Sequence, residues 1–211
     1  MNNVLILDMG GVLMQHNIPK CIELFQHLLG EKEMEQVMGL AVNGEGYSNS
    51  LVEKFERGLI NTDEFIGAIL PHTRPGTTRQ DVINAWLTMH KGIPAERLQL
   101  LQQWKEQGYH LFLLSNNNEL HWNDIMTHYD MTAFEHCFAS HIMHYSKPDI
   151  RIYQAVEEYL QQHHFTTPYI FVDDNQANRE VAQSLHWITY PDLDTLATHL
   201  QPPTVKSLKH T

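Results

Sequence analysis

The sequence is poor in cysteine and has no long hydrophobic run. Its two cysteines, Cys21 and Cys137, form no evident disulfide framework, which is typical of a reducing compartment. No apolar stretch approaches the roughly 20 residues that a membrane-spanning helix needs. The first residues lead at once into a predicted strand, without the basic segment that begins a signal peptide. We therefore expect a cytoplasmic protein that neither crosses nor binds a membrane.

Basic residues are also scarce. The chain of 211 residues has 14 Lys and Arg against 25 Asp and Glu, a formal net charge of -11 at pH 7. A nucleic-acid partner requires a basic face that neutralises phosphates, so we expect no such partner. A small anionic substrate is compatible with this charge, because a bound metal ion can reverse its sign locally. We expect a small-molecule partner and a monomer or weak dimer.

Short apolar runs alternate with stretches of helical periodicity over most of the chain. This alternation predicts an α/β protein with a doubly wound parallel sheet and a Rossmann-like core. In such a sheet, ligands bind at the carboxyl ends of the strands, near the point where the strand order reverses. The expected strands lie at residues 4–7, 111–114, 137–140, 169–172 and 187–190.

A run of helices without a strand separates the first expected strand from the others. One of these helices is ended by Gly30 and another by Gly58, and a third is opened by a capping box of Asn61 and Glu64. We expect residues 1–15 and 91–211 to form the core and residues 16–90 to form an inserted helical cap. A polar, Gly-rich loop is expected at residues 43–50, and a poorly ordered tail from Pro202.

Polar residues follow four of the expected strands. They are Asp8, the pair Ser115–Asn116, Lys147 after a short loop, and the pair Asp173–Asp174. The carboxyl ends of parallel strands meet at one end of a sheet, so these side chains should form one site. Carboxylates suit a hard cation such as Mg²⁺, an aspartate can act as a nucleophile, and an ammonium can neutralise a phosphoryl group. The set therefore favours phosphoryl transfer.

These strand ends carry sequence motifs that resemble a known family. The segments are DMGGV from Asp8, LLSN ending at Asn116, SKPD around Lys147 and FVDDN around Asp173. In this order they resemble the four motifs of the haloacid dehalogenase superfamily of hydrolases, whose helical cap matches the position of the helical insertion. The chain looks most similar to the subgroup with α-D-glucose-1-phosphate phosphatase and the amino-terminal phosphatase domain of epoxide hydrolases, also in the cap segment 55–60.

The resemblance implies a role for each residue of the expected site. Asp8 would attack phosphorus and form an aspartyl-phosphate, and Lys147 would neutralise Asp8 and the developing charge. Ser115 and Asn116 would hold the phosphoryl oxygens, and Arg57 of the cap could clamp the substrate. The Asp8 carboxylate, the Gly10 backbone carbonyl and Asp174 would hold Mg²⁺, while Asp173 would bind through water or orient the site. The expected activity is that of a Mg²⁺-dependent phosphatase on a small metabolite such as a sugar phosphate.

An aspartate is missing from the first motif. Many phosphatases of the family have Asp two residues after the nucleophile, where it protonates the leaving oxygen and then activates water. Gly10 stands here instead. General acid–base catalysis contributes roughly 10² to 10⁴ in rate. We therefore expect a slow or selective phosphatase that prefers leaving groups needing little protonation, such as anomeric sugar, aryl or acyl phosphates. His16, just past the first strand, could replace the lost acid.

Two other functions compete with this interpretation. Haloacid dehalogenases also lack an acid at this position, but they use no metal. The pair Asp173–Asp174 favours a Mg²⁺ site, because three carboxylates without a cation would repel one another and raise a pKa. A non-catalytic relative that only binds a phosphate ligand is the second alternative. The retained Asp8 counts against it, since a binding protein has no use for a nucleophile.

Overall fold

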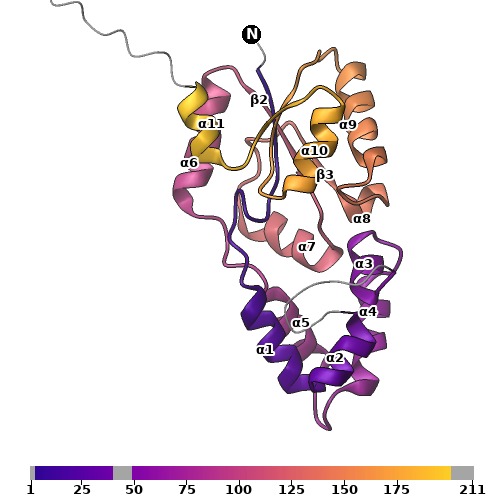
Figure 1. The fold of residues 1–211 in the computed structure, drawn as a ribbon. Coiled ribbons are helices and arrows are strands. Elements are labelled where there is room, and N and C mark those ends of the chain that lie inside the picture. The colour runs from indigo at the N-terminus through magenta and orange to yellow at the C-terminus, as the bar shows by residue number, and fades with distance from the viewer. Residues whose placement is uncertain (1–2, 40–48, 201–211) are drawn as a thin grey trace, which may run out of the picture.

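The computed structural model describes residues 3–39 and 49–200. The loop expected at residues 43–50 lies mostly outside this part of the chain, and the tail expected from Pro202 lies wholly outside it. Figure 1 shows a sheet flanked by helices, with a group of further helices at one end of it. The polypeptide leaves the sheet after its first strand, forms the group of helices, and then returns to complete the sheet.

The sheet has five strands, all parallel, in the order β3-β2-β1-β4-β5. This arrangement confirms the predicted α/β fold with a doubly wound parallel sheet. Leu5 of the central strand is aligned with Leu111 on one side and Ile170 on the other. The strands are β1 (Val4–Leu7), β2 (His110–Ser115), β3 (His136–Ala139), β4 (Ile170–Val172) and β5 (Ile188–Tyr190).

Both faces of the sheet are buried at its central strands, which explains the apolar runs in the sequence. Along β1, Leu5 and Leu7 belong to one hydrophobic cluster, whereas Val4 and Ile6 belong to another on the opposite face. Side chains of a strand alternate between the two faces of a sheet, so a run that is apolar at every position fits only a strand covered on both sides. The carboxyl ends of the central strands are therefore positioned by packing on both faces.

Helices supply the cover on each face. The first cluster includes apolar side chains of α6 (Ala95–Glu106), α7 (Glu119–His128) and α11 (Leu193–Leu200). The second includes those of α9 (Ile150–Gln162) and α10 (Gln176–Ser184). The sequence did not predict α11, nor the short helix α8 (Ser140–Met143), whose first residue was assigned to the preceding strand. Leu193 and Leu196 of α11 are buried against the sheet, and this distant contact stabilises a helix of only 8 residues.

The inserted helices have a hydrophobic cluster of their own. At its centre Phe55 stacks on Phe65 with ring centroids 4.2 Å apart, and the Trp86 ring lies 5.0 Å from Phe65. The capping box of Asn61 and Glu64 is present as predicted, with both of its hydrogen bonds formed. The helices are α1 (Ile18–Leu29), α2 (Glu31–Met38), α3 (Leu51–Glu56), α4 (Thr62–Ile69), the 3₁₀ turn η1 (Leu70–His72) and α5 (Arg79–Leu87).

The two segments that join this helical group to the sheet run side by side. His16 and His90 form an antiparallel bridge between them. The Asn17 amide donates to the Met89 carbonyl at 2.6 Å, and the Lys91 amide donates to the Gln15 carbonyl at 3.0 Å. A paired double connection of this kind is short and well defined, so it restricts how the helical group can turn relative to the sheet.

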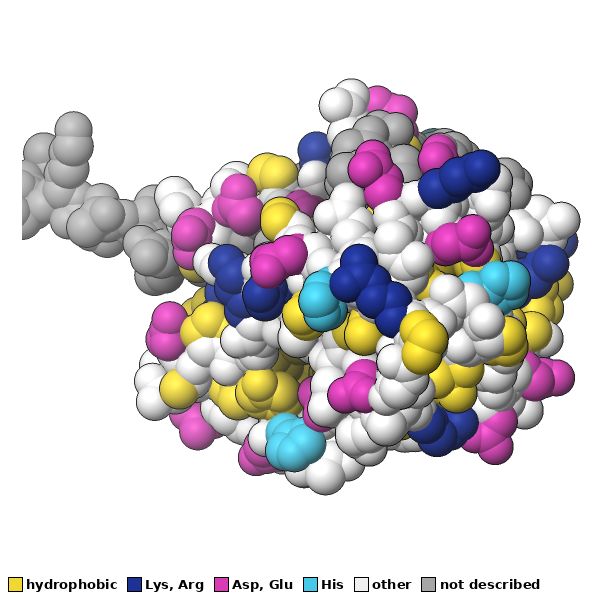
Figure 2. All heavy atoms as spheres, turned by 90° about the horizontal axis from the view of Figure 1, so that it is seen from below, with side chains coloured by type: hydrophobic (Ala, Val, Ile, Leu, Met, Phe, Trp, Pro, Cys, Tyr) yellow, Lys and Arg dark blue, Asp and Glu magenta, His cyan; other side chains and the backbone are white. Residues whose placement is uncertain are grey.

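Figure 2 views the molecule from the end where the helical group lies. Acidic and basic side chains are interspersed on this face, among scattered apolar ones. Among the described helices, none has both the length and the apolar character needed to span a membrane.

Candidate active site

Asp8 lies where β1 ends, at the centre of the sheet. Its amide donates to the Val172 carbonyl of β4 at 2.8 Å, so the parallel pairing continues to this residue. The chain then makes a compact turn in which the amides of Leu13 and Met14 both donate to the Met9 carbonyl. Asp8 is 8% exposed, and its Oδ1 accepts from the Met9 amide at 2.7 Å. The sheet therefore fixes the backbone of this carboxylate, and the turn fixes its side chain.

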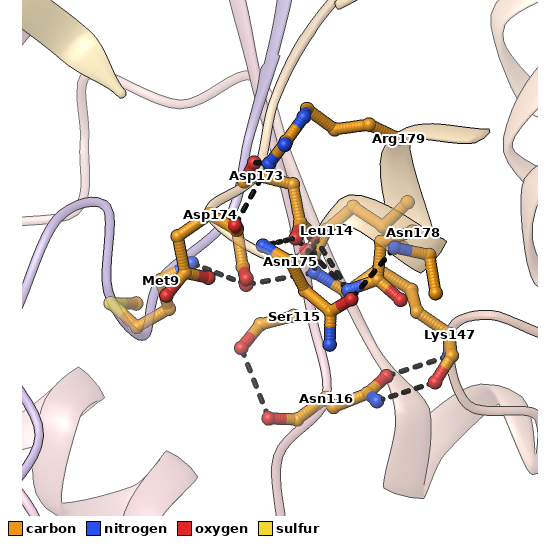
Figure 3. Close-up of polar contacts among 12 residues, drawn as sticks. Met9, Leu114, Ser115, Asn116, Lys147, Asp173, Asp174, Asn175, Asn178 and Arg179 are labelled. Carbon is orange, nitrogen blue, oxygen red and sulfur yellow. Dashed lines mark hydrogen bonds and ion pairs between the residues drawn. The ribbon is translucent and has the colours of Figure 1, made fainter. Parts of the chain in front are cut away.

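Lys147 connects Asp8 to the neighbouring strands. Its buried Nζ lies 2.9 Å from Asp8 Oδ1. It also lies 2.6 Å from Asp173 Oδ2 and donates to the Leu114 carbonyl at 2.9 Å (Figure 3). An ammonium has three protons to donate, and these three oxygens use all of them. The ammonium thus joins groups at or near the carboxyl ends of β1, β2 and β4.

Asn116 holds the backbone of Lys147 in place. Its Nδ2 donates to the Lys147 carbonyl and its Oδ1 accepts from the Lys147 amide, both at 2.8 Å (Figure 3). Both polar groups of this side chain are therefore engaged within the protein. Ser115, the last residue of β2, is buried, and its hydroxyl has only a long contact of 3.3 Å to the Asn116 carbonyl. Of the two predicted phosphoryl-binding side chains, Ser115 is the one with a hydroxyl free for a ligand.

The two aspartates after β4 differ in their surroundings. Asp173 is fully buried and accepts from Lys147, from the Asn175 amide at 2.9 Å, and from Asn178 Nδ2 at 3.0 Å (Figure 3). Asp174 is exposed and lines the cavity beside Asp8. Arg179 donates to the backbone carbonyls of both, at 2.6 and 2.8 Å, which fixes this turn.

The charges of the site perturb its ionisation. Burial raises the pKa of Asp8 to about 7; Lys147 acts in the opposite direction, and Asp173 adds to the increase. Burial alone would lower the pKa of Lys147, but the attraction of Asp8 and Asp173 outweighs it, so that pKa is raised. The ammonium therefore stays charged, and the Asp8 carboxyl needs further positive charge to stay ionised at neutral pH.

A divalent cation fits this group of carboxylates. Asp8, Asp173 and Asp174 each offer a ligand oxygen, and these oxygens lie within 4.8 Å of one another. Hard oxygen ligands of this kind suit Mg²⁺. A second observation agrees, because the Oδ1 of the buried Asn178 has no hydrogen-bond partner among the described residues and lies in the cavity wall. The donor set thus fits the predicted cofactor.

Gly11 is required next to Asp174. Its φ of +73° is rarely adopted by other residues, and an added Cβ would lie 2.0 Å from Asp174 Oδ2. The tight turn after β1 therefore brings the backbone of the first motif against the carboxylate of the last. Any side chain at residue 11 would displace Asp174 from the carboxylate cluster.

His16 occupies the space that Gly10 leaves empty. A Cβ added to Gly10 would lie 2.3 Å from His16 Nε2 and 2.4 Å from its Cε1. The imidazole thus lies where a side chain of residue 10 would begin. Burial lowers the pKa of His16, while Asp174 acts in the opposite direction. The sequence placed His16 near the first strand, and the structure brings its ring to the position of the missing acid.

These residues surround a cavity of about 410 Å³. The predicted site residues that line this cavity are Asp8, Gly10, Ser115, Asn116, Lys147 and Asp174. Asp173 lies behind them as a buried partner of Lys147. Arg57 does not line the described cavity; its guanidinium lies 3.5 Å from Glu53 and donates to the His144 carbonyl at 3.4 Å.

The cavity is also lined by residues that the sequence analysis did not assign to the site. They are Glu56 and His90 from the helical group and its connection, together with Asn117, Asn175 and Asn178. The three asparagines continue the motifs after β2 and β4, so their nearness to those motifs was an available signal. Glu56 lies in the cap segment 55–60 that the sequence singled out, but the expected site role in that segment was given to its neighbour Arg57.

A parallel sheet that ends in a buried aspartate, a lysine and further carboxylates defines an α/β enzyme with its site at the strand ends. The family model of haloacid dehalogenase-like hydrolases matches residues 3–186, and the chain belongs to this family. This match confirms the predicted superfamily and the prediction that the chain is a hydrolase. The proposed subgroup stays a prediction.

Known proteins with similar sequences or folds span nearly the whole chain. The sesquiterpene phosphatase astK of Aspergillus oryzae is 26% identical over 93% of this chain and 92% of its own length. A family enzyme of Bacteroides thetaiotaomicron, solved with magnesium and inorganic phosphate, is 28% identical, with a TM-score of 0.77 over 90% of this chain and 93% of that one. L-2-haloacid dehalogenase from Xanthobacter autotrophicus is 16% identical, with a TM-score of 0.55 over 90% of this chain and 76% of that one, which shows the shared fold alone.

Replacing Lys147 by methionine should destabilise the protein strongly. The change keeps most of the side-chain volume but leaves the buried Asp8 and Asp173 without their cation, and breaking such a pair costs about 3–5 kcal/mol. Urea unfolding measures this loss. Lys20→Met is the matched control, because Lys20 and Glu23 form an exposed pair that contributes little. Equal stabilities of the two variants would contradict the role given to Lys147.

Gly11→Ala should weaken the binding of Mg²⁺. Gly76 also has a positive φ, but a Cβ added there meets nothing within 4 Å, so Gly76→Ala reproduces the backbone strain without the collision. Each substitution should cost about 1–2 kcal/mol of stability. Only Gly11→Ala should reduce Mg²⁺ affinity, by roughly tenfold or more, in calorimetric titration with the metal alone. A similar Mg²⁺ affinity in both variants would show that Asp174 does not help to bind the metal ion.

Proposed function

We propose that this chain is a Mg²⁺-dependent phosphatase that acts on a small phosphorylated metabolite through an aspartyl-phosphate on Asp8. The observation that carries the proposal is the position of Asp8, 2.9 Å from the Lys147 ammonium and within one carboxylate cluster with Asp173 and Asp174. The similar enzyme of Bacteroides thetaiotaomicron, solved with magnesium and inorganic phosphate, supports it. So does the phosphatase named among the relatives.

The metal would be held by Asp8, the Gly10 carbonyl and Asp174. Asp173 is the less suitable direct ligand, because Lys147, Asn175 and Asn178 already use its two oxygens. We assign Asp173 to orienting Lys147 instead. When bound, Mg²⁺ supplies positive charge that keeps Asp8 ionised and that attracts the phosphoryl oxygens.

Asp8 performs the covalent step. Its Oδ1 is held by the Met9 amide and Lys147, while Oδ2 has no hydrogen bond within the described chain. An Oδ2 lone pair attacks phosphorus, and the bond to the leaving oxygen breaks with its electron pair on that oxygen. Water then attacks the phosphorus of the aspartyl-phosphate, which releases inorganic phosphate and restores the carboxylate. The Ser115 hydroxyl donates to a phosphoryl oxygen in both steps, and the charge of the Lys147 ammonium, whose three protons are used within the protein, attracts the phosphoryl group.

His16 supplies the function that Gly10 lacks. Its ring lies where the side chain of residue 10 would begin, on the wall of the same cavity. An imidazole can protonate a leaving oxygen and then take a proton from the attacking water. Because His16 comes from the connection between the sheet and the helical group rather than from the sheet, we propose that it replaces the missing aspartate only partly. The preference for leaving groups that need little protonation follows from this.

The cavity favours a small polar leaving group. Among the described residues that line it, Met9 has the only large apolar side chain, and the others are charged or hydrogen-bonding apart from Gly10. A sesquiterpenoid chain, the substrate that the name of the Aspergillus relative indicates, would find few apolar partners there. A sugar phosphate would find many polar ones. Two observations count against the alternative functions. A metal-independent dehalogenase does not need the Asp174 carboxylate beside Asp8, and a protein that only binds phosphate does not need an Asp8 oxygen that is available to attack.

Residues 16–90 would serve as the cap over this site. They contribute His16, Glu56 and His90 to the cavity, so the helical group closes one side of it. A cap of this kind excludes water and opens to release product. Both cysteines are free, which agrees with the reducing cytoplasm that we propose as the location.

Asp8→Asn should abolish Mg²⁺-dependent hydrolysis. The amide keeps the size of the side chain but cannot attack phosphorus, so kcat/KM for p-nitrophenyl phosphate and for sugar phosphates should fall by roughly 10³-fold or more. Asp194→Asn, at an exposed position on α11, is the control that should keep wild-type rates. Activity retained in Asp8→Asn would disprove the covalent mechanism. Metal-independent release of chloride from 2-chloropropionate by the wild type would instead favour the dehalogenase alternative.

His16→Gln should slow esters with poor leaving groups most. Alkyl phosphates need a proton on the departing oxygen, so their kcat/KM should fall by up to roughly 10²-fold, whereas p-nitrophenyl phosphate should change much less. The measurement is the slope of log kcat/KM against leaving-group pKa, which should become steeper. His199→Gln, on the exposed side of α11, should leave the slope unchanged. A uniform loss across all esters would assign His16 to binding rather than to proton transfer.

A further inference from the structure

Glu56 is the one acidic residue of the helical group that reaches the catalytic cavity among the described residues. It is the last residue of α3, at the end of the helical group nearest to the sheet. It belongs to the cap segment 55–60 but to none of the four motifs at the strand ends, and the mechanism above gives it no task. Its neighbour Arg57, which was the predicted substrate clamp, lies outside the cavity.

The backbone around Glu56 is fixed against α8 of the core. The buried hydroxyl of Ser140 lies 2.5 Å from the Glu56 carbonyl, and the same hydroxyl accepts from the Asn117 amide at 2.8 Å. His144 Nδ1 donates to the Arg57 carbonyl at 3.0 Å. A Cβ on Gly58 would lie only 2.0 Å from the His141 carbonyl, so the two segments are in close contact. Glu56 is therefore held in place at the cavity by the core itself.

The Glu56 carboxyl has no hydrogen-bond or ion-pair partner among the described residues. The Arg57 guanidinium, which could have neutralised it, is directed to Glu53 and to the His144 carbonyl. Burial, with a smaller contribution from Glu53, raises the pKa of Glu56 to about 7. Glu56 is half-buried at the cavity wall, so its carboxyl is open to a ligand there and has no partner within the described protein. A ligand that donates hydrogen bonds to this carboxyl would supply the missing partners.

The other groups in the cavity indicate which donor fits. Phosphoryl oxygens fit the end with Lys147 and Ser115, whereas Glu56 comes from the helical group. Imidazoles of His16 and His90 and the Asn117 amide offer both donors and acceptors. A hydroxyl also donates and accepts, whereas an ammonium only donates. A second anionic group would be repelled by Glu56, Asp8 and Asp174 together.

We propose that Glu56 selects the leaving group, by accepting hydrogen bonds from hydroxyls of a neutral sugar or polyol and by disfavouring esters with a second negative charge. This role rests on the proposed phosphatase function, and it makes Glu56 a specificity residue rather than a catalytic one. It also explains why Ser140 connects the Glu56 carbonyl to Asn117, since that contact sets the position of the cap carboxyl relative to the motif after β2.

The test compares selectivity ratios in Glu56→Gln and Glu56→Ala. The kcat/KM for a hexose 1-phosphate is divided by that for p-nitrophenyl phosphate, which has no hydroxyl on its leaving group. Loss of hydrogen bonds to a carboxylate should lower this ratio by roughly tenfold to a hundredfold in Glu56→Ala, and by less in Glu56→Gln, whose amide oxygen still accepts. The ratio of phosphoglycolate to p-nitrophenyl phosphate should rise in both variants.

Glu23→Gln is the matched control, because Glu23 is an exposed glutamate on α1 of the helical group and pairs with Lys20 outside the cavity. Its ratios should equal those of the wild type. Unchanged ratios in both Glu56 variants, an equal loss on every ester, or a wild-type preference for phosphoethanolamine would overturn the inference while leaving the phosphatase function intact. If the wild type hydrolyses none of these esters with Mg²⁺, the proposed function fails and the inference fails with it. If Glu56→Ala does not fold, Glu56→Gln decides.

Discussion

The buried Lys147 ammonium is the interaction on which the rest of the site depends. It joins the carboxylates of Asp8 and Asp173 and the carbonyl that ends the apolar run of β2, so it fixes three neighbouring strand ends relative to one another. Taking these charges out of water is costly, and buried ion pairs often add little net stability. Here the buried ion pairs serve to position the groups of the site. The cluster keeps Asp8, the proposed nucleophile, at the mouth of a closely packed sheet, and its remaining negative charge favours a divalent cation.

The glycine at position 10 has two structural consequences. It removes a carboxylate from a site that already has three, and it leaves space for the His16 ring. His16 belongs to the paired connection between the sheet and the helical group, where it bridges to His90. The proton-transfer group of the proposed mechanism therefore lies on the same segment that joins the helical group to the sheet. In that mechanism, proton transfer would depend on the position of the helical group, which would not hold for an aspartate carried by the turn after β1.

The sequence predicted those parts of the molecule that depend on local pattern and topology. Buried strands are apolar at every position, and parallel strands end at one edge, so Asp8, Lys147 and Asp173 could be brought together without coordinates. The part of the cavity wall that the helical group supplies could not be predicted from the sequence, because it depends on how two separately packed units contact each other. Arg57 and Glu56 are adjacent and both polar, and only the contacts with α8 decide which one lines the cavity. The helix α11 was missed because its stability comes from burial against the distant sheet.

The central claim is that Asp8 carries the phosphoryl group between the two steps. The most direct measurement is acid quenching during turnover of p-nitrophenyl phosphate with Mg²⁺, followed by mass spectrometry of the peptide that contains Asp8. The account predicts one phosphoryl group on Asp8 in the wild type, and none when Mg²⁺ is omitted or when Asp8 is replaced by Asn. Rapid turnover with no modification of Asp8 at any quench time, together with an Asp8→Asn variant that still hydrolyses the ester, would contradict it.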